Sequence, residues 1–160
     1  MKILISEIPN KKLFGGSIQT SFAKQETSKL WRPFRAKIAN LPLLNPKKFY
    51  SIQRYGAEMK MGVLGLDTLF EKCAAIEFLE GENPDSFEEI NLEGGLYAVF
   101  EHKGSALDFQ KSLQNFLENW LPGSGYELDS RNHFETFDEN YDPFSANSVE
   151  LVWIPIKRLN

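Results

Sequence analysis

Residues 125–139 (GYELDSRNHFETFDE) carry the densest group of side chains that could do chemistry: five acids and one of the two histidines of the chain. His133 and Glu135 are two residues apart, so on a β-strand their side chains would lie on the same face. Such a pair could move protons to and from a substrate. A metal site would need at least a third ligand, and no HExxH or CxxC spacing accompanies the pair. Two interpretations stay open, an acid–base pair and the polar side of a strand, and no metal or cofactor is expected.

The composition is that of an ordinary globular domain, with 42% apolar and 25% charged residues among 160. Thirteen Phe, five Tyr and three Trp favour a ring-rich core or pocket. The net charge of −4 and the lack of a Lys/Arg run argue against direct nucleic-acid binding. A single cysteine, Cys73, and the absence of a membrane-length apolar run predict a cytoplasmic protein.

Segments with helical spacing alternate with β-rich segments. One helix is expected from Thr27 or nearer Leu30 to about Asn40, because Pro33 is tolerated best in a first turn. A second helix is expected over 105–120. Strands are expected at 11–22 (interrupted at Gly15-Gly16), 49–56, 73–79, 96–103 and 148–156, with an extended lead-in at 1–8. The repeated order of strand, helix, strand, strand predicts an α+β domain of two pseudo-symmetric modules, about 1–90 and 91–160, with antiparallel sheets around a central cleft.

Three stretches of the second half resemble the GyrI-like small-molecule-binding family: YAVFEHKG (97–104), WLPGSGYELDSRNHFE (120–135) and WIPIK (153–157). LWRPF (30–34) and FEKCAAIEF (70–78) extend the resemblance more loosely into the first half. The family includes effector-binding domains of AraC-type and multidrug-sensing transcription regulators, and stand-alone forms. The resemblance implies a duplicated strand–helix–strand–strand fold whose central cleft binds hydrophobic, often cationic, ligands. We expect a stand-alone domain without a DNA-binding module.

The resemblance changes the interpretation of the opening stretch. Its sequence motif resembles that of the family, and its carboxylates are then expected to be mostly structural or solvated. A cleft for a cation needs aromatic faces and a carboxylate, which directs attention to six ligand-binding candidates: Glu150, Trp153, Tyr97, Glu77, Trp120 and Trp31. Core packing is the alternative for the four aromatic residues, and an exposed strand end is the alternative for Glu77.

Glu150 stands one residue from where the family pattern places an acid. In many relatives a glutamate lies four residues before the proline of the last strand, a position that Leu151 occupies here. A one-residue shift reverses the facing of a strand residue, so Glu150 is expected to point away from the family's acid position unless a bulge resets the register. A cleft-facing and a solvated Glu150 both stay open.

Three functions are compatible with the sequence. The favoured one is a sensor or sequestering protein that binds an amphipathic or aromatic ligand and acts on transcription through a separate protein partner. The second is a hydrolase of strained, cyclopropane-bearing natural products, in which Glu150 or Glu77 would act with Tyr97; catalysis is the less favoured expectation. The third is an inhibitor that acts through protein contacts. Neither nucleic acid nor a membrane is expected as a direct partner.

Overall fold

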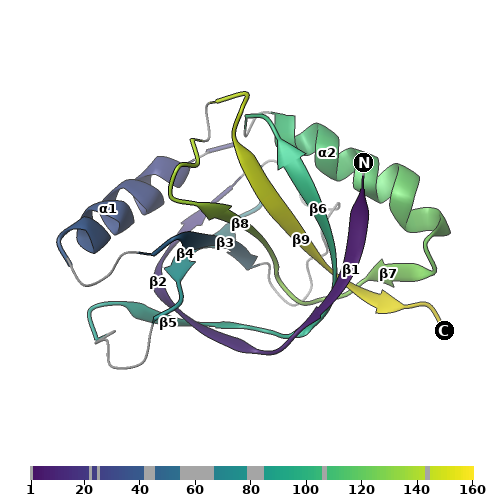
Figure 1. The fold of residues 1–160 in the computed structure, drawn as a ribbon, viewed down its shortest axis with the longest axis horizontal. Helices are drawn as coiled ribbons and strands as arrows, with labels where there is room; N and C mark the ends of the chain where they lie inside the picture. The colour runs from purple at the N-terminus through teal and green to yellow at the C-terminus, as the bar shows by residue number, and fades with distance from the viewer. Residues whose placement is uncertain are drawn as a thin grey trace.

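The computed structural model describes residues 2–21, 23–24, 26–41, 46–54, 67–78, 85–105, 108–142 and 145–160. These residues form two main helices and nine strands (Figure 1). The elements are β1 (Ile3–Ile8), β2 (Lys11–Thr20), α1 (Thr27–Ala39), β3 (Lys48–Arg54), β4 (Phe70–Ile76), β5 (Glu88–Leu92), β6 (Gly95–Lys103), α2 (Phe109–Asn115), β7 (Tyr126–Leu128), β8 (His133–Asp138) and β9 (Val149–Arg158). A π-helical turn, Phe116–Trp120, and a 3₁₀ turn, Leu121–Gly123, continue α2.

One antiparallel sheet connects both modules. Its order is β1-β6-β9-β8-β3-β4-β2-β5, and β7 pairs with β9 beside this path. The modules β2-α1-β3-β4 and β6-α2-β8-β9 meet where β3 pairs with β8, so the order of strands on one side of that seam repeats on the other. Both helices lie on the same side of the sheet, one beside each module (Figure 1). The predicted α+β fold with two strand–helix–strand–strand modules is confirmed.

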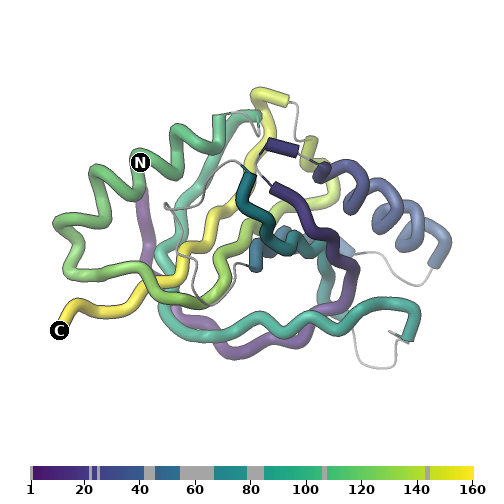
Figure 2. The backbone as a smooth tube through the Cα atoms, turned by 180° about the vertical axis from the view of Figure 1, so that it is seen from behind, coloured from purple at the N-terminus to yellow at the C-terminus, as the bar shows by residue number. Residues whose placement is uncertain are grey.

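The lead-in strand of each module is added to the sheet of the other module. β1 precedes β2 in the chain but pairs with β6, whereas β5 precedes β6 but pairs with β2. Figure 2 shows the β1–β2 and β5–β6 segments running alongside each other below the helices. At this crossing the backbone N–H of Gly94 donates to Oδ1 of Asn10 at 2.7 Å. A side chain at Gly94 would overlap the carbonyl oxygen of Ile8, so the crossing requires glycine there.

Alternation along the strands divides the core between two faces of the sheet. The face toward the helices, here the helix-bearing face, carries two apolar clusters. Under α1 lie Leu30, Phe34, Ile38, Phe49, Ala74 and Ile76. Near α2 lie Ala98, Phe100, Phe116, Val152, Ile154 and Ile156. The opposite face carries a third cluster, which includes Leu13, Tyr50, Ile52, Tyr97 and Phe134.

Three local features refine or correct the expectations. α1 begins at Thr27, the earlier of the two expected starts, and Pro33 lies in its second turn. β2 runs in continuous register with β4 through Gly15 and Gly16, without the expected interruption. β5 was not predicted from its sequence, EEINL, in which three of five residues are polar. No helix in the described part of the chain is long and apolar enough to cross a membrane.

Candidate functional site

A row of polar side chains crosses the helix-bearing face between the two apolar clusters. We call this row the polar band; its members are Ser51, Gln53, Lys72, His102, His133, Glu135 and Glu150. Strand register places them on one face: Gln53 lies opposite both His133 and Lys72, and Ser51 lies opposite Glu135. Glu150 lies opposite His102, whose ring contacts Phe109 of α2. The band therefore brings together residues of five strands.

The polar band is buried except for Lys72, which is half-buried. Gln53 is 5% exposed, Glu135 6% and Glu150 7%. Burying polar groups is unfavourable unless they form hydrogen bonds. The side chain of Gln53 bonds to Glu135, and its amide also reaches Oγ of Ser51 at 3.5 Å. Among the described residues, however, neither Oε2 of Glu135 nor Oε1 of Gln53 has a partner. The centre of the band thus retains unused hydrogen-bonding capacity.

Glu135 and Glu150 form an acid pair on neighbouring strands. Glu135 lies opposite Val152, and Glu150 lies two residues before Val152 on β9, so the two acids are diagonal neighbours on one face. Burial, and then the charge of Glu150, raises the pKa of Glu135 to about 8. Burial also raises the pKa of Glu150, although His102 and a hydrogen bond from Tyr141 act against this. The pair therefore retains a proton more readily than ordinary carboxyl groups do.

The groups around the acid pair supply little compensating charge. Burial raises the pKa of Tyr141, as does its hydrogen bond to Glu150, so its hydroxyl remains a donor. Burial lowers the pKa of His133 to about 3, so its ring is neutral near pH 7. Lys72 is half-buried, and its charge lowers the pKa of both acids. Among the described residues, Lys72 thus faces both buried carboxyl groups, and His102 faces Glu150.

Aromatic rings flank the polar band on both sides. On the α1 side, Phe137 stacks on Tyr141 with ring centroids 4.3 Å apart, and Trp31 lies 5.2 Å from Phe137. On the α2 side, Phe109 contacts the ring of His102. Further along α2, Phe116 stacks between Phe100 and Trp120, and Trp120 stacks on Tyr126, which pairs with the end of β9 remote from Glu150. Trp31 and Trp120, both predicted from the sequence, therefore lie on the same face as Glu150, each packed among rings beside its helix.

The other three predicted residues lie on the opposite face. Trp153 stacks on Phe134 at 5.3 Å, and the hydroxyl of Tyr97 donates to the carbonyl of Glu93 at 2.6 Å. Glu77 accepts a hydrogen bond from Tyr50 at 3.1 Å and forms an ion pair with Lys11 at 3.0 Å. The structure therefore does not bring Tyr97 or Glu77 to Glu150.

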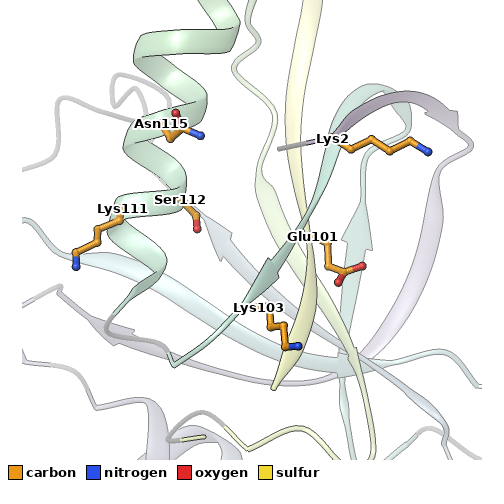
Figure 3. A pocket seen from close by; sticks show the side chains of 6 residues that line it. All are labelled: Lys2, Glu101, Lys103, Lys111, Ser112 and Asn115. Carbon is orange, nitrogen blue, oxygen red and sulfur yellow. The ribbon is translucent and has the colours of Figure 1, made fainter. Parts of the chain in front are cut away.

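A separate open hollow of about 590 Å³ lies beside α2 and the end of β6. Its lining residues are Lys2, Glu101, Lys103, Lys111, Ser112 and Asn115 (Figure 3). The side chains of Lys2 and Lys111 extend in opposite directions, so the polar groups do not converge on one point. The buried acid pair is the stronger candidate for a functional site.

Comparison with known proteins identifies the chain. The model of the GyrI-like small molecule binding domain matches residues 1–157. The chain belongs to this family. The transcriptional regulator BrlR of Pseudomonas aeruginosa is 32% identical over 89 residues, which are 54% of this chain and 33% of the regulator. The GyrI-like chain thus matches about a third of that regulator's length.

Solved structures share the fold of this GyrI-like domain at low sequence identity. SAV2435 bound to tetraphenylphosphonium has a TM-score of 0.69 at 18% identity, over 98% of this chain and 94% of that one. The C-terminal domain of EcmrR has a TM-score of 0.67 at 17% identity, over 99% and 98%. A hydrolase encoded by lin2189 of Listeria innocua has a TM-score of 0.61 at 9% identity, over 98% and 92%. These likenesses show a common fold.

Several residues of the GyrI-like site were not among the predicted candidates: Glu135, Gln53 and Tyr141. Glu135 was noticed through its spacing from His133, but its carboxylate was expected to be structural or solvated, and it is buried without full hydrogen bonding. The signal that could have found it is the alternation in HFETF, since His133 and Glu135 share a face with Phe137. Glu150, whose facing was open, is buried on the helix-bearing face, and β9 has no bulge along β6.

The burial of Glu135 and His133 leads us to expect that the domain loses stability as the pH rises from 6.5 to 8. Folded Glu135 keeps its proton up to about pH 8, whereas the unfolded chain loses it near 4.5. Its stabilising contribution is therefore complete below pH 4.5 and disappears as the pH rises through 8. His133 acts in the opposite sense, because its pKa falls from 6.5 to about 3 on folding. Its contribution is present above pH 6.5 and is lost as the pH falls toward 3.

We expect the free energy of unfolding to fall between pH 6.5 and 8, where, of the Glu135 and His133 contributions, only that of Glu135 changes. The expected slope is about 1.4 kcal/mol per pH unit. Urea unfolding measured across this range checks it. Glu135→Gln should flatten the slope, whereas Glu89→Gln, an exposed acid paired with Lys12, should retain it. A wild-type stability that stays constant across the range would contradict the assigned burial of an uncharged Glu135.

Proposed function

We propose that this domain binds a bulky aromatic monocation on the helix-bearing face, with the acid pair as its counter-charge. One observation carries the proposal: two carboxyl groups are buried as diagonal neighbours, and among the described residues Lys72 is the lysine whose charge acts on both. A buried carboxylate is strongly unfavourable unless a cation or hydrogen bonds compensate it. A ligand cation at this position would supply the missing charge.

The rings beside the acid pair suit the apolar part of such a ligand. Phe137, Tyr141 and Trp31 lie on one side, and Phe109, which contacts the ring of His102, lies on the other. Each ring face that meets a cation contributes roughly 0.5–2 kcal/mol. The structural neighbour SAV2435 is bound to tetraphenylphosphonium, a cation of this kind, which supports the same ligand class here.

We infer that ligand binding serves a signalling or sequestering role in the cytoplasm. The similarity to BrlR, a transcriptional regulator, and to EcmrR, whose structure has been solved as a complex with DNA, supports a connection with transcription control. The signal would pass from this domain to a separate protein partner.

Isothermal titration with tetraphenylphosphonium and with neutral triphenylphosphine oxide tests the proposal. The wild type should bind the cation in preference to the neutral compound. Glu135→Gln and Glu150→Gln should each weaken cation binding at least about tenfold, since each removes a charge that acts in a poorly hydrated place. Glu89→Gln should bind like the wild type. Saturable cation binding that neither acid variant alters would reject the acid pair as the counter-charge.

A hydrolase is the second candidate, favoured by the pairing of two buried acids. Neighbouring carboxyl groups whose pKa values are raised can divide the roles of general acid and general base. Incubation with strained cyclopropane-bearing compounds, followed by mass spectrometry, tests this candidate. Turnover that disappears in Glu150→Gln would support it, and turnover that persists in both acid variants would exclude the pair from catalysis.

A further inference from the structure

The charge state of the acid pair determines whether a binding cation has to displace a proton. Two carboxyl groups that are neighbours in a poorly hydrated place do not both ionise unless a cation compensates them. The titratable and charged groups that face the pair come from β4, β6, β8 and the segment after β8: Lys72, His102, His133 and Tyr141. Of these, Tyr141 and His133 are uncharged near pH 7. Lys72 can balance one carboxylate, and both ring nitrogens of His102 are engaged by Ser112 and the carbonyl of Ser105, which leaves the other carboxylate without a directly bonded positive charge.

The hydrogen bonding at the centre of the polar band also favours a proton on the acid pair. Oε2 of Glu135 and Oε1 of Gln53 are buried, and neither has a partner in the described part of the chain. Both atoms are acceptors as long as Glu135 is ionised. A proton on Glu135 converts one of the two into a donor. Without a bound cation, the hydrogen-bonding needs of Glu135 and Gln53 are therefore better met when Glu135 is protonated.

We propose that the acid pair holds one proton while no ligand is bound, and that a monovalent organic cation binds by releasing this proton to the solvent. The inference rests on the proposed function, because it describes the same site. The exchange is charge-neutral: one O–H bond of a carboxyl group breaks, the proton passes to water, and the ligand's charge takes its place. The high pKa of Glu135 supports this exchange near neutral pH.

Proton release makes affinity depend on both pH and ligand charge. Below the pKa of the pair, affinity for a permanent cation should rise about tenfold per pH unit, because each binding event releases one proton. A neutral ligand of the same shape displaces no proton, so its affinity should not rise with pH. The domain would then discriminate between charged and neutral aromatic compounds most strongly at mildly alkaline pH.

Calorimetry of the wild-type domain with tetraphenylphosphonium, in phosphate and in Tris at the same neutral pH, counts the released protons. The two buffers have different ionisation enthalpies, so the difference in observed heat gives the number of protons. About one released proton supports the exchange. Binding without proton release overturns the exchange and leaves the proposed function intact. Absence of binding overturns both.

A ligand-independent measurement tests the bound proton itself. Carboxyl ¹³C NMR of the glutamate-labelled free protein should show a signal, that of Glu135, that titrates well above the ordinary range of about 4.3. That signal should be absent in Glu135→Gln, should move to lower pH in Glu150→Gln, and should be unchanged in Glu89→Gln. If every glutamate of the free, folded protein titrates in the ordinary range, the inference is wrong, whatever the outcome of calorimetry.

Discussion

Gly15→Ala is expected to destabilise the domain far more than a methyl group added to a strand usually does, by about 4 kcal/mol or more. A Cβ at this position would overlap the carbonyl oxygen of Ala74 and lie 2.8 Å from the Cα of Ala75. Both neighbours are backbone atoms of β4, so no side chain can move aside. β2 would have to separate from β4 at a point where it also pairs with β5.

Gly16→Ala is the matched control, because the same methyl group added one residue later meets nothing within 4 Å. Alanine is also the better strand residue by roughly 0.5–1 kcal/mol. We therefore expect Gly16→Ala to leave stability unchanged or slightly higher. Thermal and urea unfolding of the two variants check this. Equal stabilities for Gly15→Ala and Gly16→Ala would contradict the close packing of β2 on β4.

Arg131→Lys is expected to lower the free energy of unfolding by about 3 kcal/mol or more, although it conserves the charge. The Arg131 guanidinium pairs with Asp129 at 2.9 Å and donates to the carbonyl oxygens of Gly94, Leu96 and Ile156. It also covers the ring of Tyr97 at 4.6 Å. An ammonium group cannot make these contacts together, so buried carbonyl groups lose their donors.

Arg54→Lys provides the comparison for Arg131→Lys. Arg54 forms an ion pair with Glu71 at 2.6 Å, and its side chain is 29% exposed against 12% for Arg131. A lysine can retain a single ion pair, so the expected loss is below about 1 kcal/mol. Chemical denaturation of both variants gives the difference directly. A loss for Arg131→Lys that is no larger than the loss for Arg54→Lys would show that the guanidinium contacts at the crossing contribute little.

The repeated order of elements was predictable because it depends on local periodicity. Leu30, Phe34 and Ile38 recur at helical spacing and are all buried in α1. The exchange of β1 and β5 between modules was not predictable, because pairing between strands so far apart in the chain leaves no periodic signal in either strand. For β5, which is mostly polar, even the strand itself was missed.

Less of the site was predictable, since it depends on which face of a strand is covered. Glu150 was selected, but its facing depended on register and could not be decided from spacing. Trp153 and Tyr97 were selected as aromatic residues near it, yet strand alternation places them across the sheet. Gln53 lies in a segment with no unusual composition, and only the pairing of β3 with β8 brings it to Glu135.

The exchanged lead-in strands have a consequence for how the domain can move. Each module borrows an edge strand from the other, and the two connections cross at Asn10 and Gly94. Neither module can then swing away as a rigid lobe without tearing strands from both. The molecule has no hinge at its seam and should melt in one cooperative step. A ligand that contacts either module would consequently make the whole domain more rigid, because strands β1 and β5 couple the two modules.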